Sequence, residues 1–187
     1  MRLTKPRIAP LSDAEMGPEH KEALKDFGPN ILNIFRTMVR EPKALTRFNA
    51  WGGYVLSRRN DLPPREREIV ILRTGFLCKS GYEFTQHTRI GLNSGLTADE
   101  IARIKVGATA PGWTAAEALL LKASDELHND QFITEATWTA LRNNFTEKQC
   151  MDVVFTAAQY TQVSMFLNTF GVQLDEGQTL DPDLKGF

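Results

Sequence analysis

A long stretch without charged side chains near the end of the chain constrains the fold most. Residues 153–174 contain no Asp, Glu, Lys or Arg, and a helix of that length could span a bilayer. Amide, hydroxyl and phenol groups interrupt it, however, and each would cost several kcal/mol if left unpaired in hydrocarbon. We therefore predict a helix that packs against other helices or against another subunit. The polar residues are Gln159, Tyr160, Thr161, Gln162, Ser164, Asn168 and Thr169.

Signals for helix starts recur along the rest of the chain, whereas strand signals do not. Three capping boxes begin at Thr97, Thr114 and Thr146, where the threonine and a Glu or Gln three residues later satisfy each other's backbone donors. Pro42 and Pro63-Pro64 mark two more starts, because proline is tolerated in a first turn. No run alternates polar and apolar residues for long enough to indicate a sheet. The sequence therefore predicts an all-α fold.

Length and composition fit a single domain over residues 1–187. A chain of 187 residues can bury roughly two-thirds of the surface that its unfolded form exposes. With 24% charged residues and a net charge of -1, it lacks the basic excess that a nucleic-acid partner favours.

Ser12 is expected to cap a first helix that ends near Gly28. Residues 1–10 and 176–187 are expected to be terminal arms.

The first residues and the cysteines predict a cytoplasmic protein. Residues 1–6 lack the apolar segment and the small-residue cleavage site of a secretion signal. Cys78 and Cys150 lie far apart with no C-x-x-C motif, which argues against a disulfide scaffold or a thiolate metal site. We expect two reduced thiols, and neither a membrane nor a nucleic acid as partner.

The segment from Glu68 to His87 carries the residues best suited to chemistry. Glu68 shares a helical face with Leu72 and Gly75, so its carboxylate is expected to point inward, where it needs a partner. Glu83 and His87 are four residues apart and therefore neighbours on one face. A carboxylate beside an imidazole fixes its tautomer and lets the ring exchange a proton near neutral pH. An exposed pair without function is the alternative.

A longer string of motifs around these residues is similar to that of a known protein family. The string runs from Leu62 to Glu68, continues as Leu77-Cys78-x-Ser80-x-Tyr82-Glu83-x-x-x-His87, and ends with Gly95-Leu96-Thr97-x-x-Glu100. It resembles the carboxymuconolactone decarboxylase family, which includes the alkylhydroperoxidase D proteins. The resemblance covers about residues 51–171. It implies an alkylhydroperoxidase D-like core of about seven to nine helices in a homo-oligomer (dimer, trimer or hexamer), with sites near subunit contacts.

The peroxidase branch of this family implies a Glu-x11-Cys-x2-Cys-x3-His relay. In that register this sequence has Glu68, Ser80, Glu83 and His87, so the proton-handling ends are present and both thiols are absent. Disulfide exchange needs one thiolate that attacks and a second thiol that resolves the product. Cys78 lies two positions before the expected attacking cysteine and has no resolving partner nearby. A peroxidase-like oxidoreductase is therefore an alternative that depends on Cys78.

The decarboxylase branch implies that a small carboxylated lactone loses carbon dioxide and that the resulting carbanion or enolate is protonated, without a cofactor. His87 with Glu83 could deliver the proton, and Arg73 could pair with the substrate carboxylate. A structural salt bridge from Arg73 to Glu68 or Glu83 is the alternative. The leading prediction is a lyase that acts by general acid–base catalysis on such a lactone or an aromatic-derived acid. A non-catalytic oligomeric binding protein is a third hypothesis.

Further side chains are expected to contact the substrate. Trp51 and Tyr82 could line an aromatic pocket, although aromatic residues at helical spacing more often belong to the core. Tyr160 and Asn168 are polar groups on the uncharged helix that need partners. The glutamate–histidine pair lacks convincing further ligands, so no metal ion is expected. The predicted substrate-binding residues are Arg73, Tyr82, Ser80, Trp51, Tyr160 and Asn168.

Overall fold

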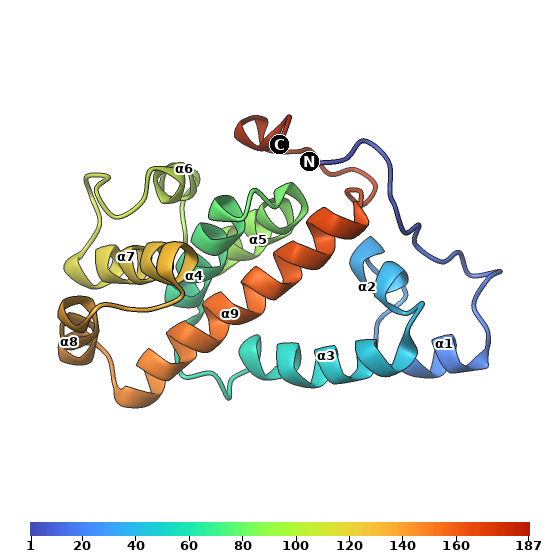
Figure 1. The fold of residues 1–187 in the computed structure, drawn as a ribbon, viewed down its shortest axis with the longest axis horizontal. Coiled ribbons are helices and arrows are strands. Elements are labelled where there is room, and N and C mark those ends of the chain that lie inside the picture. The colour runs from blue at the N-terminus through green and yellow to red at the C-terminus, as the bar shows by residue number, and fades with distance from the viewer.

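The computed structural model describes all 187 residues and contains only helices and connecting segments (Figure 1). This confirms the all-α prediction and the expected number of helices. Nine α-helices are followed by a short 3-10 helix, with these bounds: α1 (Pro18–Ala23), α2 (Asn33–Met38), α3 (Pro42–Val55), α4 (Pro64–Leu77), α5 (Gly81–Asn93), α6 (Ala98–Val106), α7 (Ala115–Asp130), α8 (Glu135–Asn144), α9 (Glu147–Phe170) and η1 (Pro182–Leu184).

The starts of the helices follow the local signals in most places. Thr97, Thr114 and Thr146 cap α6, α7 and α9, and each forms a capping box with the residue three positions later. The prediction for Ser12 was wrong, because α1 begins only at Pro18. The side chain of Glu15 instead accepts hydrogen bonds from the Ser12 amide and hydroxyl, at 2.8 and 2.6 Å, and closes an isolated turn.

Helix α4 lies at the centre of the fold. It packs against α5, α7 and α9, and every residue from Glu68 to Gly75 is buried. The largest apolar cluster forms around it and includes Ile69, Leu72 and Leu121. Because this stretch of α4 is covered on all sides, its charged residues Glu68 and Arg73 must find their partners inside the protein.

Helix α9 is the uncharged stretch predicted from the sequence, and it crosses the molecule diagonally (Figure 1). One face packs on α3, α4, α5, α7 and α8. The opposite face stays uncovered in the single chain, where Met151 is 46% and Met165 is 61% exposed. None of the nine helices combines the length and apolar character needed to cross a bilayer.

The two terminal segments are packed on the helices rather than free. The amides of Arg7 and Ile8 donate to the Phe170 carbonyl at 2.8 and 3.1 Å. At the other end, Leu184 is buried in the largest apolar cluster, and its carbonyl accepts a hydrogen bond from the Met1 amino group. The two termini therefore lie close together, as Figure 1 shows.

Arg73 joins α4 to the end of α6 and to α7. Its guanidinium contacts Asp125 at 2.6 Å and donates to the Ile104 and Lys105 carbonyls at 2.9 and 2.8 Å. Gly107 follows α6 with a φ of +100°, and a Cβ there would lie 2.6 Å from the guanidinium. Both the backbone conformation and the close approach of Arg73 therefore require glycine at this position.

We predict that Gly107→Ala destabilises the fold more than Gly95→Ala. Gly95 has a similar φ of +96° but open space around it, so Gly95→Ala measures the cost of the backbone conformation alone. Each change should lower the free energy of unfolding by about 1–3 kcal/mol through backbone strain, and Gly107→Ala should add the cost of displacing Arg73. Chemical denaturation measures both values. Equal losses would mean that the Arg73 contact contributes little.

Candidate active site

Three ionisable side chains from α4 and α5 form a buried cluster. Nδ1 of His87 lies 2.7 Å from Oε2 of Glu68 in a hydrogen bond, and Nε2 lies 3.0 Å from Oε1 of Glu83. The contact with Glu83 is an ion pair outside hydrogen-bond alignment, because its Oε1 has no hydrogen-bond partner. All three residues are at least nine-tenths buried. The imidazole is thus held between two carboxylates.

Two glycines let α4 and α5 approach closely enough to form this cluster. A Cβ on Gly75 would lie 3.3 Å from Cγ of Glu83, and a Cβ on Gly91 would lie 3.2 Å from a Leu72 methyl group. Both distances are tighter than ordinary van der Waals contacts. Larger residues would separate the helices, and the Glu68 carboxylate on α4 would then lose its contact with His87 on α5.

The two carboxylates determine the protonation of His87. Burial alone would lower the pKa of the imidazole, but the nearby charge of Glu83 and the hydrogen bond and charge of Glu68 outweigh it and raise the pKa to about 10. The ring is therefore an imidazolium at neutral pH. The cluster holds one proton firmly, and that proton can leave only to a strongly basic partner.

His87 and Glu83 open onto a cavity of about 920 Å³, while Glu68 lies behind them. The cavity lies between α3, α5 and α9, with α1 along its edge. Its volume is in the range of small-molecule sites. Part of its wall is apolar, made by Leu32, Ile34, Phe35, Phe48, Leu56 and Val163. The arrangement places a proton donor at the wall of a largely apolar pocket.

Two polar side chains of α9 complete the wall beside His87. The ring of Tyr160 meets the imidazole edge to face, with ring centres 4.8 Å apart. Burial, followed by the charges of Glu83 and Glu68, raises the pKa of Tyr160 well above its usual value, so the phenol stays protonated. Gln159 is 3% exposed, and its Oε1 has no hydrogen-bond partner. Gln159 was not among the predicted site residues, although it belongs to the polar residues of the uncharged helix.

The other predicted substrate-binding residues lie in different surroundings. Tyr82 lines the cavity, but its hydroxyl donates to Asp175 at 2.6 Å. Ser80 precedes α5, is fully buried and does not line the cavity. Trp51 stacks on Tyr54 at the surface and is 41% exposed. The structure therefore brings Tyr82 and Tyr160 to the cavity with His87, but neither Ser80 nor Trp51.

Arg73, Asn168 and Cys78 also lie outside the cavity. Arg73 is held by Asp125 and two carbonyls, so the expected salt bridge exists with a different partner from Glu68 or Glu83. Asn168 donates to the Cys78 carbonyl at 2.9 Å, and both residues line a second cavity. None of the three is in position to bind a substrate beside His87, because none lines its cavity.

A comparison with protein families matches the part of the chain that holds the cluster. Residues 42–125, which include α4 and α5, match the carboxymuconolactone decarboxylase family. This segment of the chain is therefore similar to a carboxymuconolactone decarboxylase domain. A comparison with curated protein sequences gives no match.

Solved structures place the fold among alkylhydroperoxidase D-like proteins. An uncharacterized peroxidase-related protein with an alkylhydroperoxidase D core, from Ralstonia eutropha JMP134, is 18% identical with a TM-score of 0.77 over 90% of this chain and 93% of that one. A peroxidase-related protein from Silicibacter sp. TM1040 is 15% identical with a TM-score of 0.71, over 99% and 94%. The debrominase Bmp8 in complex with 2,3,4-tribromopyrrole is 11% identical with a TM-score of 0.72, over 92% and 94%. At these identities the likeness establishes the fold alone.

The raised pKa of His87 predicts a specific pH dependence of stability. Because the pKa rises from 6.5 to about 10 on folding, the stabilisation is complete below about pH 6.5 and is lost as the pH rises toward 10. Within that window the free energy of unfolding should fall more steeply with rising pH than in a His87→Gln variant. The difference between the two slopes should correspond to the loss of nearly one proton on unfolding. Denaturation at several pH values measures both slopes. Identical slopes would show that His87 is neutral in the folded protein.

Proposed function

We propose that this protein is a cofactor-independent lyase that removes carbon dioxide from a small carboxylated lactone or aromatic-derived acid by general acid–base catalysis. The observation that carries the proposal is the buried ring of His87, held between Glu68 and Glu83 at the wall of a substrate-sized cavity. The match of residues 42–125 to the carboxymuconolactone decarboxylase family supports the choice of reaction.

The proposed proton transfer follows from the positions of the two ring nitrogens. When the substrate's carboxylate carbon leaves as carbon dioxide, the bonding electron pair stays on the neighbouring carbon as a carbanion or enolate. Nε2 of His87 then gives its proton to that carbon, and Nδ1 keeps the proton that it shares with Glu68. An enolate is a far stronger base than the neutral imidazole that the transfer leaves, so the proton transfer is downhill. A proton from solvent restores the imidazolium beside Glu83.

The walls of the cavity suggest how an acidic substrate would be held. Two carboxylates and one imidazolium leave the cluster with one net negative charge, so a substrate anion needs compensation elsewhere. Glu19, Glu22 and Asp26 also line the cavity, but Lys43 and Arg89 in its lining are exposed and have no carboxylate partner within 4 Å. Tyr160 and Gln159 offer hydrogen bonds beside the reacting carbon. We propose that the substrate's anionic group binds near the two cations and that its ring lies against the apolar wall.

A peroxidase of the thiol type is the weaker proposal for this cavity. It requires a thiol near His87, whereas Cys78 does not line the cavity and Ser80 and Glu83 occupy the two cysteine positions of the relay. The acid–base cluster needs no thiol. We therefore assign the His87 cavity to proton transfer.

A panel of carboxylated lactones and aromatic-derived acids, assayed in deuterium oxide, tests the proposal. We expect carbon dioxide release and one deuterium on the carbon that lost it, measured by mass spectrometry. His87→Gln and Glu83→Gln should lower kcat by about 10²-fold or more, the usual contribution of a positioned acid. Glu68→Gln should lower kcat and move the alkaline limb of the pH profile to lower pH, because the amide no longer stabilises the imidazolium.

Two controls separate the proposal from its alternatives. Cys78→Ser should leave turnover unchanged, and a loss would favour thiol chemistry. Circular dichroism and melting temperature should show that the His87→Gln variant still folds. If no acid in the panel is decarboxylated, or if His87→Gln keeps full turnover, the proposed reaction is wrong.

A further inference from the structure

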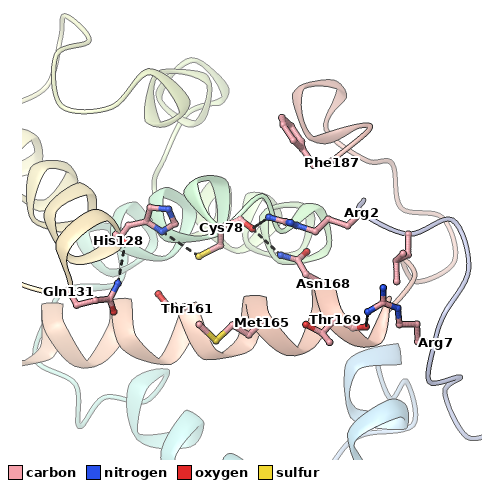
Figure 2. Close-up of a pocket in the computed structure, with 11 residues that line it drawn as sticks. Arg2, Arg7, Cys78, His128, Gln131, Thr161, Met165, Asn168, Thr169 and Phe187 are labelled. Atoms are coloured by element: carbon pink, nitrogen blue, oxygen red, sulfur yellow. Dashed lines mark hydrogen bonds between the residues drawn. The ribbon is translucent and has the colours of Figure 1, made fainter.

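A second cavity lies between the C-terminal ends of α4 and α7 and the outer face of α9. It measures about 640 Å³ and shares no lining residue with the His87 cavity. Figure 2 shows its side chains, which come from five separate parts of the chain. Because the two cavities are separate, chemistry in this one does not depend on the proposed lyase reaction.

A thiol and an imidazole meet at the inner end of this cavity. Sγ of Cys78 lies 3.7 Å from Nδ1 of His128, as the dashed line in Figure 2 marks. Ser164 on α9 is 1% exposed, and its hydroxyl has no hydrogen-bond partner. The hydroxyls of Ser164 and Thr161 favour the ionised form of the Cys78 thiol and so act to lower its pKa. The thiol therefore has a base in direct contact and nearby hydroxyls that favour its ionised form.

The thiol needs this base in order to react. Burial raises the pKa of Cys78, and the hydroxyls of Ser164 and Thr161 and the charge of Arg2 offset that only in part. Cys78 is therefore a neutral thiol at neutral pH, which is not the reactive form. An imidazole at this distance can accept the proton as the sulfur attacks.

The outer part of the cavity carries positive charge without compensation. Arg2 and Arg7 are exposed, line the cavity and have no carboxylate within 4 Å; Arg2 contacts the Cys78 carbonyl at 3.5 Å, and Arg7 the Thr169 carbonyl at 3.5 Å. No acidic side chain is among the lining residues. Guanidinium groups placed in this way bind carboxylates well. A ligand that reaches the thiol is therefore selected for negative charge.

We propose that this cavity is a thiol-exchange site, in which Cys78 reacts with a small anionic disulfide that Arg2 and Arg7 hold. Nδ1 of His128 takes the thiol proton while the sulfur attacks one sulfur of the ligand. A new disulfide bond forms as the old one breaks, and the leaving thiolate takes the proton from His128. Cys78 is oxidised and the departing half of the ligand is reduced, so no further oxidant is needed.

The test compares three disulfides of different charge on the intact protein. Oxidised glutathione is anionic, 2-hydroxyethyl disulfide is neutral and cystamine is cationic. Intact mass and peptide mapping report the rate and position of the mixed disulfide. We expect modification at Cys78 alone, fastest with oxidised glutathione and slowest with cystamine. An equal or reversed order would overturn the anionic selectivity, and this comparison needs no variant.

Variants locate the groups responsible. The double change Arg2→Gln and Arg7→Gln should slow the reaction with oxidised glutathione at least fivefold and leave 2-hydroxyethyl disulfide nearly unaffected. His128→Gln should slow all three reagents by a similar factor, because the base acts on the thiol and not on the ligand. If these variants behave like the wild type, the assignment of the arginines or of the base is wrong.

Cys150 provides a matched internal control. It is the second free cysteine and is fully buried, and it lines neither cavity. Cys150→Ser should leave modification unchanged, whereas Cys78→Ser should abolish it. Modification of Cys150, or none at all without denaturant, would overturn the proposal. His87→Gln should keep full exchange at Cys78, which separates a failure of this site from a failure of the lyase reaction.

Discussion

The burial of the middle of α4, from Glu68 to Gly75, forces the two charged residues of that stretch to pair inside the protein, and the rest of the structure depends on those pairs. Glu68 is 1% and Arg73 is 7% exposed. A buried ion pair adds little net stability over apolar packing, but one charge left without its partner is costly. Arg73 holds the end of α6 and Asp125 of α7 against α4, whereas Glu68 holds α5 against α4 through its contact with His87. The first pairing is structural, and the second produces the candidate active site.

The same constraint explains the chemistry available at His87. A histidine beside one exposed carboxylate would titrate near neutral pH, but two buried carboxylates keep this ring charged up to about pH 10. Such a group is a poor base and a well-defined acid. It suits a reaction whose intermediate is strongly basic, as a carbanion is, and it suits protonation better than proton abstraction. The excess negative charge of the cluster is also the reason that the proposed function places the substrate's anionic group near Arg89 and Lys43.

The sequence predicted those features that depend on local spacing. The capping boxes at Thr97, Thr114 and Thr146 and the Glu83–His87 pair involve residues three or four positions apart, and all four exist. Contacts between distant helices were harder to predict. The approach of Glu68 to His87 was suggested only by the family resemblance. The partner of Arg73 and the neighbour of Cys78 are set by the position of α7, which no local pattern of the sequence contains.

The turn between α4 and α5 decides that the acid–base cluster and the thiol face different cavities. Only Cys78, Lys79 and Ser80 connect the two helices, and Lys79 adopts a left-handed φ of 55°. This sharp reversal leaves Cys78 at the end of α4, facing His128, while Glu83 in the first turn of α5 lines the other cavity. A substrate would have to enter both cavities to use the thiol and His87 together. Because the two cavities have no lining residue in common, a relay of protons and electrons through both groups has no shared pocket in this fold.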